Sequence, residues 1–306
     1  MARFATIDVG TNTVLLLVVE RAGAELSPVI ERAEITRLGR GVDRSGRLDP
    51  AAIDDTVRVL ARFAGEARAL GAERIACVAT SAARDASNGA AFFERARAEA
   101  GLEPEVISGD EEARLVWASA WHDFGARAPG ALVVVDVGGG STEVCAGTGP
   151  LPSARRSRQR GAVRLTERAA LGDPVDAAGL AALRALARAA LEPARALALP
   201  GARMVGVAGT VTTLAAVEAA LPVYDAGVVH GSELSFGALE RLHARLGALT
   251  VAERARLPGM EPKRADVIVA GCAVVLEAMV ALGSDRLTVS DRGVRWGLAQ
   301  DRFGGG

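Results

Sequence analysis

The segments of this chain best suited to chemistry combine a carboxylate with glycine and small polar residues. One runs Asp8-Val9-Gly10-Thr11-Asn12-Thr13, and another runs Asp136-Val137-Gly138-Gly139-Gly140-Ser141-Thr142-Glu143. Backbone N–H groups exposed in such a turn can bind an anion, and the carboxylate can hold a hydrated magnesium ion against phosphate oxygens. Taken alone, the first segment is better explained as an ordinary Asp-Gly hairpin, because both residues are common in turns.

The second segment points more directly to phosphate. Its three consecutive glycines, Gly138 to Gly140, let the backbone approach a polyanion without obstruction by side chains. Asp136 and Glu143 flank this turn and are suited to binding magnesium or to orienting an attacking water. A hairpin with a purely structural role needs fewer glycines.

A third candidate, Val207-Ala208-Gly209-Thr210-Val211-Thr212-Thr213, links a predicted strand to a predicted helix. Free N–H groups and the positive end of the helix dipole favour a phosphate or the edge of a nucleotide there. Gly209 and Thr210 are the candidate ligands. Simple capping of the helix by threonine explains the same residues equally well.

Apolar runs on either side of the first two segments predict strand, turn and strand in each case. Strands are predicted at 4–9, 13–20, 29–37, 75–80, 105–108, 131–137, 142–146, 203–207 and 286–289, and helices at 50–70, 90–100, 111–121, 176–197 with a break at Pro193, 212–220, 236–246, 264–282 and after Asp291. The repeated plan predicts an α/β chain of two similarly built lobes with a cleft between them.

The composition of the chain limits the number of domains and the kinds of partner that we expect. The chain has 306 residues, 50% of them hydrophobic, which makes two domains the leading expectation. Lys plus Arg number 36 against 37 Asp plus Glu, so no overall field draws the chain to nucleic acid or to a membrane. We therefore expect neither as a partner.

The three cysteines, Cys77, Cys145 and Cys272, all lie in apolar stretches. This pattern predicts buried thiols in a reducing compartment rather than a disulfide framework. The first residues form no basic leader followed by an apolar run, and the apolar stretches are too short or too interrupted to span a membrane. A cytoplasmic location is expected.

In their order, the three loops resemble the phosphate and nucleotide loops of the superfamily of actin, sugar kinases and heat-shock ATPases. Further segments resemble the exopolyphosphatase and guanosine pentaphosphatase (Ppx/GppA) family: Ala79-Thr80-Ser81-Ala82-Ala83-Arg84-Asp85-Ala86-Ser87-Asn88, Ile107-Ser108-Gly109-Asp110-Glu111-Glu112-Ala113-Arg114 and Ser290-Asp291-Arg292-Gly293-Val294-Arg295. The resemblance implies two actin-like (ribonuclease H-like) lobes, at 1–124 and 125–306, with a final helix at about 291–303 that could return to the first lobe.

The resemblance also assigns roles to residues that chemistry alone leaves ambiguous. Glu112 matches the family's catalytic glutamate and is the expected general base, although acids in a first helical turn are common for electrostatic reasons. Arg84 could grip a phosphate with its forked guanidinium, or form a surface ion pair. Asp8, Asp136 and Glu143 are the expected magnesium ligands, and the glycine-loop residues, including Ser141 and Thr142, the expected phosphate ligands.

The implied activity is magnesium-dependent removal of the terminal phosphate of inorganic polyphosphate. Guanosine pentaphosphate is the alternative substrate, and a small-molecule kinase or a non-catalytic nucleotide sensor are alternatives of another class. The family also implies a homodimer, and this chain resembles its short form, without the helical phosphohydrolase-like region of longer members.

Two further groups of residues lie outside these motifs. Arg155, Arg156, Arg158 and Arg160 form a basic run that could follow a long polyanion, although such a run is more often a solvated face. The three histidines lack the short spacing of a zinc site, and His230 is a candidate to line the cleft.

Overall fold

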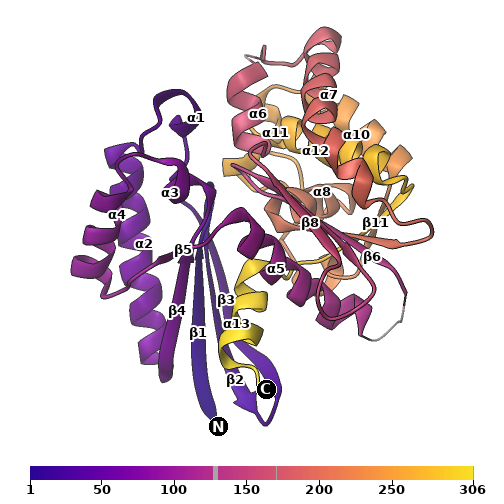
Figure 1. The fold of residues 1–306 in the computed structure, drawn as a ribbon. Coiled ribbons are helices and arrows are strands. Elements are labelled where there is room, and N and C mark those ends of the chain that lie inside the picture. Colours follow the sequence, from indigo (N-terminus) through magenta and orange to yellow (C-terminus); the bar gives the residue numbers. More distant parts are fainter. Residues whose placement is uncertain (127–129, 170, 306) are drawn as a thin grey trace. The chain divides into compact units, whose positions relative to one another are not determined.

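The computed structural model describes residues 1–126, 130–169 and 171–305. Contacts divide the chain into two compact units, one of Met1–Ser119 with Val294–Gly306 and one of Ala120–Gly293 (Figure 1). Each unit is built around its own mixed sheet, covered by helices.

The first unit contains a sheet in the strand order β3-β2-β1-β4-β5. Strands β1 (Ala2–Val9), β2 (Thr13–Ala22) and β3 (Glu25–Ile35) form an antiparallel meander, and β4 (Ala72–Ala79) and β5 (Glu105–Val106) continue the sheet in parallel with β1. Alternation along β1 sends Ala5, Ile7 and Val9 to one face and Phe4 to the other.

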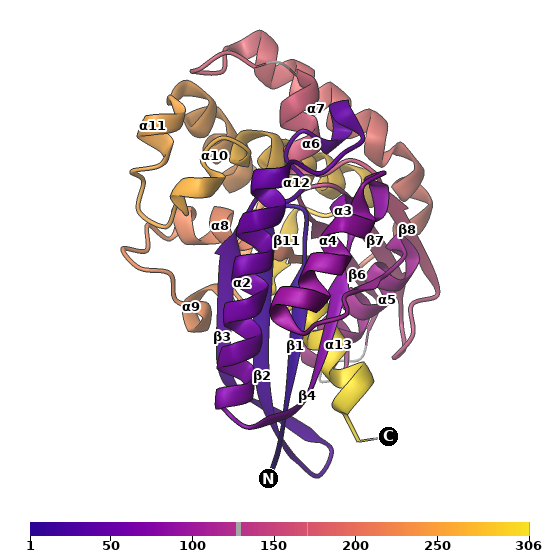
Figure 2. The ribbon, with the colours of Figure 1, turned by 90° about the vertical axis from the view of Figure 1, so that its left-hand side faces the viewer.

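Helices cover both faces of this sheet. Helices α2 (Pro50–Ala69) and α4 (Gly89–Arg95) lie on the face of Ile7, in front of the strands in Figure 2, while α13 (Val294–Phe303) packs Trp296 and Phe303 against Phe4. Helix α5 (Gly109–Ala120) packs so closely on α13 that a Cβ on Gly297 would lie 1.9 Å from the Leu115 carbonyl oxygen. The shorter helices of this unit are α1 (Val42–Ser45), α3 (Ser81–Asp85) and the π-helix η1 (Ala96–Ala100).

The second unit repeats the plan with a sheet in the order β10-β11-β9-β6-β7-β8. Strands β6 (Leu132–Val137), β7 (Thr142–Gly147) and β8 (Ala154–Arg158) form the meander. Strands β9 (Arg203–Val207) and β11 (Arg286–Val289) continue in parallel with β6, and β10 (Glu233–Ser235) closes the far edge. The shared topology confirms the predicted pair of actin-like lobes.

Helices α7 (Ala177–Leu191), α8 (Ala208–Glu218), α10 (Phe236–Ala248) and α12 (Ile268–Leu282) form the main core of the second unit. Helix α12 is its centre, because its side chains are buried almost all round. The remaining helices are η2 (Trp121–Gly125), α6 (Ala162–Ala169), η3 (Glu192–Leu197), α9 (Ala226–Val229), α11 (Val251–Arg254) and η4 (Pro262–Arg264).

Several boundaries differ from those predicted. The helix expected from Thr212 begins at Ala208, so Gly209 and Thr210 lie in its first turn rather than in a loop. Arg84 belongs to the short helix α3, which lies between the predicted strand at 75–80 and the predicted helix at 90–100 and was not itself predicted. The basic run forms edge strand β8, which went unrecognised because arginine and serine carry little strand signal. The predicted break at Pro193 is confirmed, since α7 gives way there to a 3₁₀ turn.

All three cysteines are free and buried, as predicted. Within the described ranges, no helix is both long and apolar enough to cross a bilayer.

Candidate active site

The turn between β1 and β2 is held from behind by the chain that follows β3. The Thr11 carbonyl accepts from the Gly39 N–H at 2.8 Å, and the Asn12 carbonyl accepts from the Thr36 and Arg37 N–H groups at 3.1 and 3.0 Å. The Gly10 N–H donates within the turn to the Thr13 carbonyl at 2.9 Å, whereas the N–H groups of Thr11 and Asn12 donate to no described residue and are available to an anion. Thr11, Asn12 and Thr13 are all buried.

Asp8 stands beside this turn, and only 8% of it is exposed. Its Oδ1 makes no hydrogen bond within the part of the chain that the structure describes. Burial raises the pKa of this carboxyl to about 7, and the Arg295 guanidinium opposes that rise. A buried carboxylate oxygen that lacks a donor is a fitting ligand for a hard dication.

The triple-glycine turn between β6 and β7 is held in the same way. Its Gly138, Gly139 and Gly140 carbonyls accept from Ala162 N–H at 2.9 Å, Val163 N–H at 3.0 Å and Arg164 Nε at 3.0 Å, respectively. Among the described residues, no N–H of Gly139, Gly140 or Ser141 donates within the protein. These amides are therefore available to phosphate oxygens.

Three directly opposed residues on neighbouring strands form a polar row beside this turn. Asp136 on β6 pairs with Glu143 on β7, and Glu143 pairs with Ser157 on β8. Asp136 and Glu143 are only 6% and 1% exposed. Two carboxylates directly opposite each other repel, so the pair suits a bound cation.

The opposed pair Asp136 and Glu143 therefore fits magnesium, although it does not by itself complete a ligand shell. Asp8 lies in the first unit, and Asp136 and Glu143 lie in the second. Within the described ranges, no cluster of three or more acidic, His or Cys side chains is assembled for a metal. Magnesium usually keeps several waters and takes only one or two protein carboxylates together with substrate phosphates.

Glu112 occupies the first turn of α5, where only 8% of it is exposed. Its Oε2 lies 3.5 Å from Arg84 Nη1, at the outer limit of a hydrogen bond. The neighbouring Glu111 instead forms a surface ion pair with Arg114 at 2.7 Å. The structure thus distinguishes the two glutamates. Glu111 behaves as an ordinary acid of a first helical turn, whereas Glu112 is buried.

Arg84 is held by its own surroundings as well. Its Nη1 donates to the Ile107 carbonyl at 2.8 Å, and its Nε lies 3.8 Å from Asp85. Its Nη2 is buried and makes no hydrogen bond to any described residue. A fixed guanidinium with an unused N–H group is suited to a phosphate oxygen.

The N-terminus of α8 carries the third predicted group. Among the described residues, no side chain makes a hydrogen bond that caps the start of this helix, which excludes the simple threonine cap, and Ala208 adopts a left-handed φ of 73° there. A Cβ on Gly209 would lie 2.1 Å from the Arg264 guanidinium, so the absence of a side chain at Gly209 leaves room for the arginine. Burial lowers the pKa of Arg264 to about 10, still well above neutrality. Thr210 is buried and packs against Gly271.

Arg264 is a candidate anion ligand that sequence reasoning missed. It sits 55 positions after Gly209 in the chain, just after Pro262 and Lys263, and no local motif links it to α8. Only the approach of its guanidinium to a helix N-terminus identifies it.

The predicted basic run does not present one surface. Ser157 lies opposite Glu143 and Arg155 opposite Cys145, whereas Arg156 and Arg158 lie opposite Val144 and Thr142. Alternate strand residues face opposite sides of a sheet, so the arginines divide between two faces. Arg158 Nε donates to the Ala190 carbonyl at 3.3 Å, which ties it to the end of α7.

His230 belongs to a separate polar group. Its Nδ1 accepts from the Asp291 N–H at 3.2 Å, and its Nε2 lies 3.8 Å from Asp123. The Asp123 carboxylate is nearly buried and accepts from Arg292 at 2.8 Å. These contacts explain the position of His230 within the second unit without any ligand.

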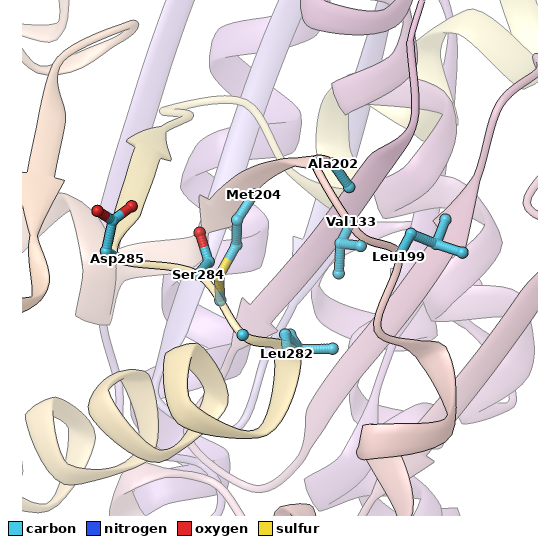
Figure 3. Close-up of a pocket in the computed structure, with 9 residues that line it drawn as sticks. Val133, Leu199, Ala202, Met204, Leu282, Ser284 and Asp285 are labelled. Carbon is cyan, nitrogen blue, oxygen red and sulfur yellow. The ribbon is translucent and has the colours of Figure 1, made fainter.

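A cavity of about 180 Å³ lies at the other end of the second sheet (Figure 3). Val133, Met204 and Leu282 line it, with Ser284 and Asp285 at one side. Val133 and Met204 stand near the starts of β6 and β9, whereas Asp136 and Gly209 stand at or beyond their ends. This cavity is therefore not part of the candidate active site.

Comparison with known proteins adds independent information. The sequence profile of the Ppx/GppA phosphatase family matches residues 17–303. The chain is 42% identical over 315 residues to Exopolyphosphatase 2 of Mycobacterium tuberculosis, covering 98% of each chain. It is 33% identical to Exopolyphosphatase 1 of Mycobacterium bovis, over 97% of this chain and 87% of that one. The crystal structure of the Aquifex aeolicus member of the Ppx/GppA family is similar, with a TM-score of 0.82, 34% identity and coverage of 98% and 97% of the two chains.

Proposed function

The chain belongs to the Ppx/GppA phosphatase family and is a phosphoanhydride hydrolase, and from this premise we propose that it removes the terminal phosphate of inorganic polyphosphate. The relatives named as exopolyphosphatases support this substrate. The observation that carries the proposal is the triple-glycine turn, whose carbonyls are bound from behind while the amides of Gly139, Gly140 and Ser141 stay available for phosphate.

Glu112 is the proposed general base. Its burial at the start of α5 holds the carboxylate on a rigid element, and Arg84 lies close enough to orient it. The carboxylate accepts a proton from water as the water oxygen attacks the terminal phosphorus. The phosphoanhydride bond to the next phosphate breaks, and the shortened chain leaves with the bridging oxygen.

Binding and charge stabilisation fall to the amides and the cationic side chains. The N–H groups of Gly139, Gly140 and Ser141 and those of Thr11 and Asn12 bind phosphate oxygens, with the Ser141 and Thr142 side chains beside them. Arg84 offsets negative charge in the transition state, and Arg264 adds a cation at the start of α8. Most of the catalysis would then come from positioning and electrostatics, as is usual for phosphoryl transfer.

Asp8, Asp136 and Glu143 would hold magnesium. The ion would neutralise phosphate charge when bound. Glu143, buried and held at a fixed position, is also suited to orienting the attacking water.

The test is phosphate release from long polyphosphate, tripolyphosphate and guanosine pentaphosphate, each with magnesium as the only addition. We expect the highest kcat/KM on long polyphosphate. A higher kcat/KM on guanosine pentaphosphate would identify that molecule as the substrate instead, with the same hydrolysis of a phosphoanhydride bond. Binding without phosphate release would identify a sensor, and phosphate release only with an acceptor present would identify a kinase.

A further inference from the structure

We propose that Ser157 is a positioning residue that sets the orientation of the Glu143 carboxylate, an inference that rests on the role of Glu143 in the proposed function. Ser157 Oγ donates to Glu143 Oε1 at 2.7 Å. A donor to a charged oxygen makes a short, strong hydrogen bond, so this contact fixes the carboxylate firmly.

The partners are brought together by strand register. Glu143 and Ser157 are directly opposed on β7 and β8, which places their Cβ atoms about 4.5–5.5 Å apart. Thr142 Oγ1 donates to the Arg160 carbonyl at 2.6 Å, a second bond between the segments that keeps the edge strand in place. The serine hydroxyl is therefore carried on a fixed backbone.

Glu143 needs such a partner because its other opposed neighbour is also an acid. Asp136 lies directly across from it on β6, and both carboxylates are buried. Repulsion between them disfavours any orientation in which both oxygens of Glu143 face Asp136. The bond from Ser157 holds Oε1 on the β8 side, away from Asp136, and so limits the carboxylate to one orientation.

The same strand register changes the interpretation of the basic run. In Arg155-Arg156-Ser157-Arg158, Ser157 is the member that lies opposite a proposed active-site acid. Arg155 shares its face but lies opposite Cys145, and Arg156 and Arg158 occupy the other face. The run is thus an edge strand in which the uncharged residue, Ser157, positions a residue of the proposed active site.

The test compares Ser157→Ala with Ser157→Thr, which keeps the hydroxyl. Ser284→Ala is the matched control, because Ser284 Oγ donates to the Arg286 carbonyl at 2.7 Å at the far end of the sheet. Loss of a partner that orients a metal ligand typically costs about 10- to 100-fold in metal affinity or activity. We expect Ser157→Ala to raise the half-saturating magnesium concentration by about that factor, with a smaller change in KM for polyphosphate at saturating magnesium.

A second readout is independent of turnover. Magnesium should raise the melting temperature of the wild type at concentrations about 10- to 100-fold lower than those needed for Ser157→Ala, with Ser157→Thr close to the wild type. If the wild type hydrolyses none of the substrates, the proposed function fails, and this titration still decides the role of Ser157. Equal magnesium titrations for Ser157→Ala and wild type would overturn the inference. Equal losses in Ser157→Ala and Ser157→Thr, with lowered melting temperatures in both, would also overturn it by showing a structural role.

Discussion

Replacing Gly161 by alanine tests whether the segment behind the triple-glycine turn sets the position of its amides. A Cβ on Gly161 would lie 2.4 Å from the carbonyl carbon and oxygen of Gly139 and 2.5 Å from the Gly138 oxygen. The φ of Gly161 lies outside the left-handed region, so alanine is compatible with the backbone there. The effect of the substitution must therefore come from the collision.

The size of the effect follows from the overlap. Carbon atoms in contact prefer a separation of about 3.5–4.0 Å, so the Gly139 backbone must retreat by about 1 Å. A displacement of that size in a positioning group can cost about a hundredfold in rate. We expect Gly161→Ala to lower kcat/KM by about that factor and to lower stability by about 1–3 kcal/mol, as overpacking usually does.

The assay is steady-state phosphate release together with the melting temperature. Gly149→Ala is the control, because no described residue other than its two chain neighbours has an atom within 4 Å of the Cβ that it adds. Gly39→Ala is a graded comparison, since its closest contact is the Thr11 methyl group at 2.3 Å, part of a side chain that can rotate. A Gly161→Ala enzyme with wild-type kcat/KM and melting temperature would refute the argument that this segment positions the amides.

Three further predictions follow from single side chains. Glu112→Gln should keep the fold and substrate binding and lower kcat by about 10²- to 10⁴-fold, because the amide cannot accept the proton; turnover within a few-fold of wild type would exclude Glu112 as the base. Asp136→Asn should raise the magnesium concentration required for half-maximal activity, because a neutral amide binds a hard dication more weakly; an unchanged magnesium titration would remove Asp136 from the metal shell. His243 is the third case: burial, with the Arg184 charge, lowers its pKa from 6.5 to about 4. Between those two values the unfolded chain binds the proton and the folded chain does not, so His243 destabilises the fold progressively as pH falls below 6.5. From pH 7 to pH 5 the free energy of unfolding should fall by about 2 kcal/mol more in wild type than in His243→Gln, measured by urea unfolding; parallel pH dependences would show that His243 is not the group responsible.

The local sequence pattern was sufficient to predict most of the helices and strands and the two candidate phosphate-binding turns. Apolar runs of strand length on both sides of Gly10 and of Gly138 to Gly140 predicted β1, β2, β6 and β7. These signals are local because a buried strand requires apolar residues in its own sequence and a tight turn requires its own glycines. Elements lacking such a pattern, such as the arginine-rich strand β8 and the short helix α3, were missed or misplaced.

The sequence by itself determined the turn chemistry, the two-lobe α/β plan and the identity of Glu112 and Arg84 as candidates. Only the tertiary structure showed that Gly39 and Gly161 support the two turns from behind, that Ser157 faces Glu143 and that Arg264 lies against Gly209. These pairs are separated along the chain and are brought together by strand register and helix packing. Register depends on the pairing of whole strands, and moving it by one residue would turn Ser157 away from Glu143.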